Sequence, residues 1–159
     1  MPLKRRKKRK SNRGGTILKK DGIIFKSKLE LYCYTRLKEE NLQFEYEKYS
    51  FILQPQFEFN NESYELIKKR NNKEFKQQSQ NVRAITYKPD FVSTQDNWVI
   101  ECKGYPNDNF LLKWKMFKHF IWRNGLKIKL YVPRNQKQID EVINLIKNEQ
   151  QRKTKRNNK

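Results

Sequence analysis

The feature that most constrains the fold is a pair of apolar segments on either side of a short polar stretch. Residues 91–94 and 98–100 are apolar or β-branched for the most part, and residues 95–97 read Gln-Asp-Asn. Two such runs around a turn signal predict a β-hairpin. A two-stranded hairpin is marginal in water by itself, so this chain must build a larger sheet around it.

Three ionisable residues, Asp90, Glu101 and Lys103, stand at the open end of this hairpin. A two-residue turn at 95–96 places Asp90 opposite Glu101, with Cβ atoms about 4.5–5.5 Å apart. A turn at 96–97 places Asp90 opposite Lys103 instead and still keeps the three side chains on one face. A three-residue loop would separate them.

Two carboxylates side by side repel each other unless a cation lies between them or one of them is protonated. Mg²⁺ binds through one or two carboxylates together with substrate phosphate oxygens, and Mn²⁺ takes similar ligands. A cation at Asp90 and Glu101 would polarise a phosphodiester and lower the pKa of an attacking water, while Lys103 stabilised the developing charge. The pattern thus favours phosphodiester hydrolysis. The competing interpretation is an exposed Glu-Lys pair on a strand, with Asp90 as a turn residue after Pro89.

The chain carries 37 Lys and Arg against 17 Asp and Glu, a net charge of +20. Most of this excess lies at the ends, in a basic arm at 1–20 and a basic tail at 147–159, which we expect to be disordered. Such a charge predicts a polyanionic partner, DNA above all, with an anionic membrane surface as the competitor. The expected phosphate contacts of the arm are Lys4, Arg5, Arg6, Lys7, Lys8, Arg9 and Lys10, a run that is also typical of a nuclear address.

Between the two basic ends, residues 21–146 predict one α/β domain. We expect a helix at 27–41, opened by a Ser27–Glu30 capping box, and a strand within 44–53. Residues 60–81 are polar and predict a mobile insertion or a long hairpin tip. A helix capped by Asp108, a strand at 127–132 and a last helix at 139–146 complete a mixed β-sheet flanked by helices.

The remaining composition bounds the class of protein. A length of 159 residues suits a single core, and neither a membrane span nor a signal peptide is visible. The two cysteines, Cys33 and Cys102, are expected to be reduced thiols. We therefore expect a cytoplasmic protein, in the host cell cytoplasm if the chain is phage-encoded.

The residues around this hairpin resemble those of the PD-(D/E)XK nuclease superfamily, which has a restriction-endonuclease-like fold. Segments 27–30, 44–47, 89–91 and 101–104 are similar to the endonuclease I-type Holliday junction resolvases of phages. Segments 25–30, 53–58, 82–87 and 110–113 are similar to a phage-encoded family of the same superfamily with no assigned function. The polar insertion and the sequence after Gly104 depart from the resolvase pattern.

This resemblance implies a role for each residue of the pattern. Asp90 and Glu101 would be metal ligands, joined by the backbone carbonyl of Cys102, and Lys103 would be the catalytic lysine. Glu30 would be the catalytic carboxylate of the first helix, although it also fits the capping box. The implied cofactor is Mg²⁺ or Mn²⁺ and the implied activity is a DNA endonuclease.

Other residues admit a second explanation. Lys113 and Lys115 could reach DNA phosphates or form a solvated helix face. The only histidine, His119, is expected to pack or to be exposed, and the nearby aromatic residues suit a core better than base stacking. The alternative function is a non-catalytic nucleic-acid-binding or DNA-packaging protein that keeps the fold. A homodimer would allow cleavage of two strands, although the sequence shows no dimer contact.

Overall fold

The computed structural model describes residues 18–69, 72–77 and 81–157. The predicted contacts Lys4, Arg5, Arg6, Lys7, Lys8, Arg9 and Lys10 therefore lie outside the described residues. The last part of the expected basic arm is structured, because β1 (Leu18–Lys20) pairs with β2 (Ile23–Phe25). Asp21 and Gly22 close this hairpin with φ angles of 50° and 80°, which glycine adopts without cost.

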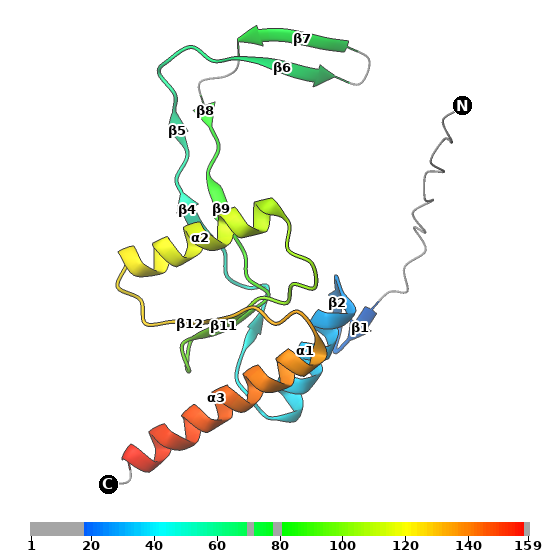
Figure 1. Ribbon diagram of the computed structural model, residues 1–159, viewed down its shortest axis with the longest axis vertical. Helices are drawn as coiled ribbons and strands as arrows, with labels where there is room; N and C mark the ends of the chain where they lie inside the picture. Colours follow the sequence, from blue (N-terminus) through cyan, green and yellow to red (C-terminus); the bar gives the residue numbers. More distant parts are fainter. Residues whose placement is uncertain (1–17, 70–71, 78–80, 158–159) are drawn as a thin grey trace, which may run out of the picture.

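A mixed sheet lies at the centre of the described chain (Figure 1). Its strands are ordered β12 (Lys129–Tyr131), β11 (Trp98–Ile100), β10 (Phe91–Ser93) and β3 (Glu45–Tyr46). Neighbouring strands are antiparallel except β11 and β12, which are parallel. The predicted hairpin is thus present and occupies the middle of the sheet.

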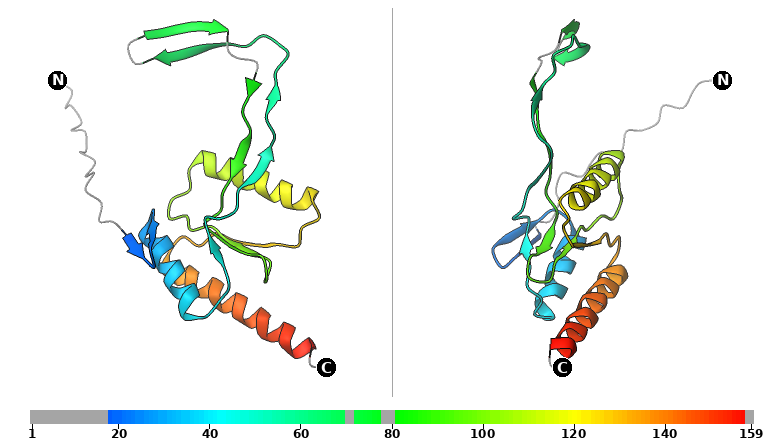
Figure 2. Two further views of the ribbon diagram at one scale, coloured as in Figure 1. Left: turned by 180° about the vertical axis from the view of Figure 1, so that it is seen from behind. Right: turned by 90° about the vertical axis from the view of Figure 1, so that its left-hand side faces the viewer.

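Helices cover both faces of this sheet (Figures 1 and 2). Phe91, Trp98 and Ile100 pack against α1 (Lys28–Glu39) and α3 (Gln136–Asn157), whereas Val92 and Val99 pack against α2 (Asp108–Arg123). Each large side chain buried in these two cores stabilises the fold by about 1.5–3 kcal/mol. The expected α/β architecture with helices flanking a mixed sheet is confirmed.

Two helix boundaries differ from expectation. The N-cap of α2 is Asn107, whose Oδ1 accepts the Phe110 N–H at 2.9 Å, and Asp108 is the first helical residue. The last helix does not end at residue 146 in a disordered tail, because α3 continues to Asn157. Its extra turns make tertiary contacts, since Lys147 pairs with Glu40, Glu149 pairs with Lys129 and Gln150 donates to Asp96.

The polar insertion belongs to a long two-stranded arm that leaves the body of the molecule (Figures 1 and 2). At its base β4 (Phe51–Gln54) pairs with β9 (Ile85–Tyr87), and β5 (Phe57–Glu58) then pairs with β8 (Asn81–Val82). The tip is the hairpin of β6 (Tyr64–Lys69) and β7 (Asn72–Gln77). The hairpin-tip interpretation is confirmed for the described part of residues 60–81. Among the described helices none is both long and apolar enough to cross a membrane.

Candidate active site

The register of β10 and β11 decides which residues meet at the open end of the hairpin. Phe91 pairs with Ile100 and Ser93 with Trp98, so the next pair outward is Asp90 with Glu101. This is the register predicted for a turn at 95–96, and the alternative that opposes Asp90 and Lys103 is wrong. The two carboxyl groups lie just beyond the facing ends of the central strands β10 and β11, and both residues are buried.

Asp90 is held by backbone groups on two sides. Its Oδ2 accepts the Cys102 N–H at 2.7 Å, and its carbonyl accepts the Glu47 N–H at 2.8 Å. The side chain is buried, and burial together with the negative charge of Glu101 raises its pKa to about 8. Asp90 therefore favours either a proton or a cation at its carboxyl group.

Glu101 is buried beside Asp90 and is held by a tyrosine. The Tyr87 hydroxyl donates to Glu101 Oε2 at 2.8 Å, within the core that packs under α2. Burial raises the pKa of Glu101, while the hydrogen bond from Tyr87 and the charge of Lys103 oppose that rise. Tyr87 thus fixes one carboxylate oxygen, and a hydrogen bond from the Asp90 backbone also holds this carboxyl group.

Lys103 acts on the nearer carboxyl of the pair, because its positive charge lowers the pKa of Glu101. Its N–H donates to the Pro133 carbonyl at 3.1 Å, so the backbone there is fixed by the segment after β12. Its Nζ lies 5.2 Å from the centroid of the Phe110 ring, a cation–π distance that directs the ammonium toward the start of α2.

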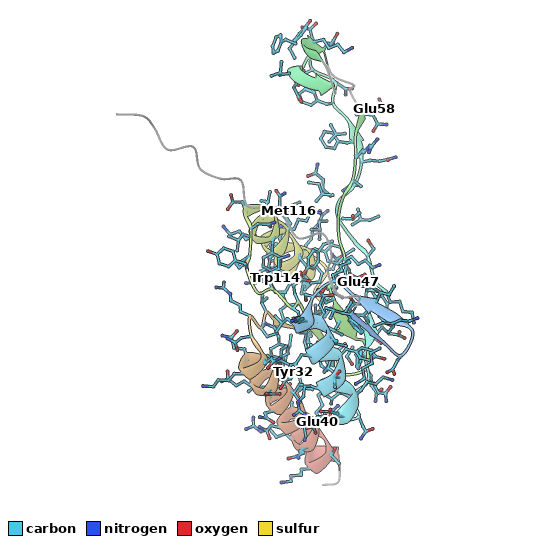
Figure 3. The ribbon with its side chains drawn as sticks, turned by 90° about the vertical axis from the view of Figure 1, so that its right-hand side faces the viewer. Tyr32, Glu40, Glu47, Glu58, Trp114 and Met116 are labelled. Atoms are coloured by element: carbon cyan, nitrogen blue, oxygen red, sulfur yellow. The ribbon has the colours of Figure 1, made fainter. Side chains whose placement is uncertain are left out.

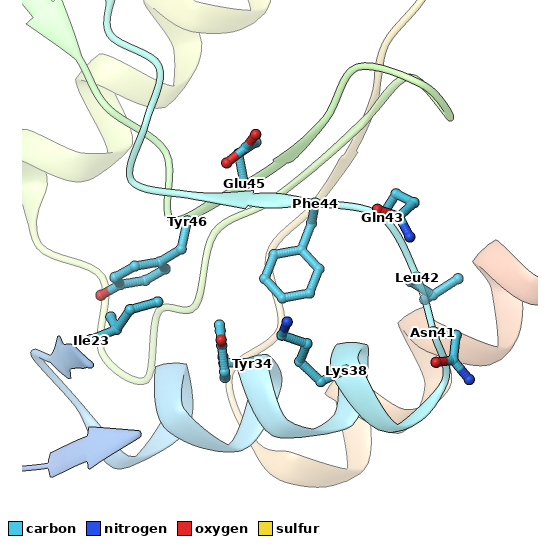
Figure 4. Close-up of a pocket in the computed structure, with 9 residues that line it drawn as sticks. All are labelled: Ile23, Tyr34, Lys38, Asn41, Leu42, Gln43, Phe44, Glu45 and Tyr46. Carbon is cyan, nitrogen blue, oxygen red and sulfur yellow. The ribbon is translucent and has the colours of Figure 1, made fainter. Parts of the chain in front are cut away.

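Glu30 combines the capping and the site interpretations. The Ser27 Oγ accepts the Glu30 N–H at 3.1 Å and begins α1, as the capping box predicts. The buried Glu30 carboxylate accepts three hydrogen bonds, from Ser27 Oγ, from the Lys26 N–H and, at 2.7 Å, from the Tyr46 hydroxyl. Figure 4 shows Tyr46 and Phe44 on the same side of β3, with Glu45 on the opposite side. Glu30 raises the pKa of Asp90, so its charge acts on the paired carboxyls.

Sequence reasoning missed three residues that touch this constellation. Tyr87 and Tyr46 donate to Glu101 and Glu30, and the only signal for either was an aromatic residue on a strand next to the motif. Glu47 has a φ of 44°, unusual for a residue with a side chain, and pairs with Lys26 while its charge raises the pKa of Asp90. Figure 3 labels Glu47 in the body of the molecule.

A comparison with protein families places this arrangement in a known group. Residues 10–137 match the family model described as a protein of unknown function, DUF1064. The chain belongs to the DUF1064 family. The match contains Glu30, Asp90, Glu101 and Lys103 and ends at the start of α3. Neither the comparison with curated proteins nor that with solved structures found a match.

Whether this DUF1064 site suits a metal ion depends on its donor set. No group of three or more His, Cys, Asp or Glu side chains among the described residues is placed to hold a metal. Mg²⁺ does not require such a cage, since one or two carboxylates, water and substrate phosphates commonly complete its six oxygen ligands. The raised pKa values of Asp90 and Glu101 mark two buried acids whose negative charge Lys103 offsets only in part, and these fit a divalent cation.

Cys102 contributes to this site through its backbone. Its thiol belongs to the core under α1 and α3, and contact with Cys33 together with burial raises its pKa. Both cysteines are free, as expected. The Cys102 N–H orients Asp90, and its carbonyl remains the candidate third metal ligand.

The other candidates from the sequence separate into buried and exposed groups. Trp114 and Phe117 are buried, as a core helix predicts, whereas His119 and Trp122 are exposed and lie with ring centroids 5.5 Å apart. Lys113 is exposed and donates to the Thr86 carbonyl at the base of the arm, and Lys115 is exposed on the same helix.

A pocket of about 370 Å³ lies elsewhere, between β3 and α1 (Figure 4). Tyr34, Phe44 and Tyr46 line it, and Tyr46 is its link to Glu30. We place the candidate site at the carboxyls instead, because the acid in the pocket lining, Glu45, is half exposed and already paired with Lys48.

Proposed function

We propose that this DUF1064 chain is a metal-dependent endonuclease that hydrolyses phosphodiester bonds in DNA. The observation that carries the proposal is that Asp90 and Glu101 lie at the ends of β10 and β11, one step outward from the Phe91–Ile100 pair, where the charge of Lys103 acts on Glu101. Side-by-side buried carboxyls are costly, and a cation-dependent reaction is the use that best accounts for them. We include in this proposal that the fold is restriction-endonuclease-like and that the chain is phage-encoded.

Each residue of the site has a role in this mechanism. Asp90, Glu101 and the Cys102 carbonyl would hold Mg²⁺ or Mn²⁺, which supplies polarisation of the scissile phosphate and activation of the attacking water. The Cys102 N–H and the Tyr87 hydroxyl keep the two carboxylates aimed at one position. Lys103 stabilises negative charge that develops on the phosphate, and Glu30, oriented by Tyr46, adds a further carboxylate at the edge.

The test is cleavage of linear, nicked, single-stranded and four-way-junction DNA, with and without Mg²⁺. We expect cleavage only with Mg²⁺ or Mn²⁺, and loss of cleavage in Asp90→Ala and Glu101→Ala with DNA binding retained. Asp108→Ala, which removes an exposed carboxylate at the start of α2, is the matched control. Full activity in EDTA would refute the proposal. A preference for the junction would support a resolvase-like role, and sedimentation would show whether a homodimer supplies the two sites.

The alternative is a DNA-binding or packaging protein without catalysis. The observation in its favour is that most of the positive charge lies in the two ends of the chain, away from the motif. Binding without cleavage of any of the four substrates, in either metal, would favour it.

A further inference from the structure

The arm, residues 51–87, exposes apolar side chains that its own fold leaves uncovered. Of its described residues, Phe51, Leu53 and Tyr87 at the base pack against the core under α2. Farther out, the arm leaves the body, and Figure 3 shows Glu58 well separated from Trp114 and Glu47. The exposed large apolar residues beyond the base are Phe57, Phe59, Tyr64, Leu66, Phe75 and Val82.

Three of these residues share one face of the tip. Leu66 pairs directly with Phe75, and alternation along β6 places Tyr64 on the same face as Leu66. The rings of Tyr64 and Phe75 stack with centroids 6.2 Å apart and an interplanar angle of 27°. Tyr64, Leu66 and Phe75 are 53%, 53% and 69% exposed. We call these three residues the tip face.

The tip combines this apolar face with positive charge. β6 and β7 together contain four lysines and two glutamates, in a chain of net charge +20. Cations favour a polyanion, and apolar side chains contact thymine methyl groups in the major groove of duplex DNA. A two-stranded ribbon is also one of the shapes that the major groove admits. An acidic protein would satisfy the charge but offers no special partner for a stacked aromatic pair.

We propose that the tip face binds duplex DNA that flanks the bond cut at Asp90 and Glu101, so that the arm is a second DNA contact. This inference rests on the proposed function for its substrate. Asn81 lies six residues from Tyr87, whose hydroxyl contacts Glu101. At about 3.3 Å per residue the extended segment 81–87, which contains β8 and β9, spans about 20 Å, and this corresponds to about six base pairs at 3.4 Å each. The tip should therefore contact DNA at least that far to one side of the cut.

The experiment measures affinity for a fluorescent 40-base-pair duplex (about four helical turns) in EDTA, where cleavage plays no part. We expect Tyr64→Ser/Phe75→Ser to weaken binding about tenfold or more, because both rings that would bury apolar area in the groove are removed. Leu66→Ser should weaken it less, and Phe75→Tyr should bind like the natural chain. Leu145→Ser is the matched control, because Leu145 on α3 is also 53% exposed.

A second measurement keeps the inference testable if the double variant unfolds. Hydroxyl-radical footprinting of the natural chain should show protection that extends about six base pairs or more beyond the cut on one side only. Phe75→Leu, which keeps an apolar side chain but loses the ring, should shorten that protection.

Unchanged affinity and an unchanged footprint in these variants would overturn the inference. Loss of self-association with unchanged DNA binding would overturn it too, because the tip face would then cover a second copy of the chain. Failure of the proposed function can be told apart from failure of this inference. If the natural chain never cuts DNA but the tip variants bind DNA more weakly than it does, the proposed function fails and the arm contact is supported. A chain that cuts normally and whose tip variants bind normally refutes the arm contact alone.

Discussion

Replacing Asp90 by Asn should remove a loss of folding stability that the metal-free protein suffers as the pH rises. Without a cation, burial and the charge of Glu101 raise the Asp90 pKa to about 8, against about 3.9 for an unfolded chain. Between these values the folded state holds a proton that the unfolded state has released. The free energy of unfolding therefore falls as pH rises from about 4 toward 8.

The size of this effect follows from the two pKa values. A slope of up to about 1.4 kcal/mol for each pH unit, reduced near the folded pKa, gives a loss of about 2 kcal/mol between pH 6 and pH 8. For a domain of this size that loss lowers Tm by about 4–8 °C. Asn at position 90 carries no charge, and its amide oxygen can still accept the Cys102 N–H that Asp90 accepts at 2.7 Å.

The assay is thermal unfolding in EDTA at pH 6 and pH 8, followed by circular dichroism. The natural chain should lose stability at pH 8, and Asp90→Asn should lose much less. Asp108→Asn, an exposed acid in the first turn of α2, should behave like the natural chain. Adding Mg²⁺ at pH 8 should raise the thermal stability of the natural chain and leave that of Asp90→Asn unchanged. Identical pH dependence in the natural chain and Asp90→Asn would refute the coupling of the two carboxyls.

Three further predictions concern catalysis and binding. Tyr87→Phe removes the donor to Glu101 Oε2 and should slow single-turnover cleavage about tenfold with DNA affinity unchanged, whereas a weaker affinity at an unchanged rate would contradict its positioning role. Lys103→Ala and Lys103→Met should slow the same step by about 10²–10³ with little effect on DNA affinity in Ca²⁺, and cleavage at the natural rate in either would show that Lys103 is only a surface lysine. Deleting residues 2–17 should weaken binding to all sequences alike and reduce the log–log salt slope by about 0.9 for each phosphate that the shortened chain no longer neutralises, while an unchanged slope would assign that segment another task.

The position of Asp90 opposite Glu101 was predictable from the sequence because it depends on local geometry. A two-residue turn and a period of two along each strand are enough to bring Asp90 opposite Glu101, and no distant contact is needed. Glu30 was less certain, since its capping role is local but its contact with Tyr46 joins residues 16 positions apart.

Features that depend on distant contacts escaped prediction. The continuation of α3 beyond residue 146 rests on contacts with β12, with Glu40 and with Asp96, none of which leaves a periodic signal in the basic tail. The conformation of Glu47 could not be predicted for a similar reason. Its left-handed backbone accompanies a hydrogen bond from its N–H to the carbonyl of Asp90, which is distant in the sequence. The hairpin tip, in contrast, was expected from its polar composition, whereas its apolar face required the register of β6 and β7.

The charges near Asp90 also bear on how binding and cutting would be coupled. Glu101, Glu30 and Glu47 all raise the pKa of Asp90, so a DNA phosphate that approaches this group meets several acids at once. Phosphates of the duplex that lie more than about 8–10 Å from these acids are screened from the repulsion at physiological salt. A divalent cation at Asp90 and Glu101 would balance the charge of these two carboxylates and supply a direct partner for a phosphate oxygen. Under the proposed function the scissile phosphate would therefore enter the site only when the cation is bound. DNA affinity measured in EDTA would then depend on the arm at 51–87 and on the two basic ends of the chain, and not on the carboxyl pair.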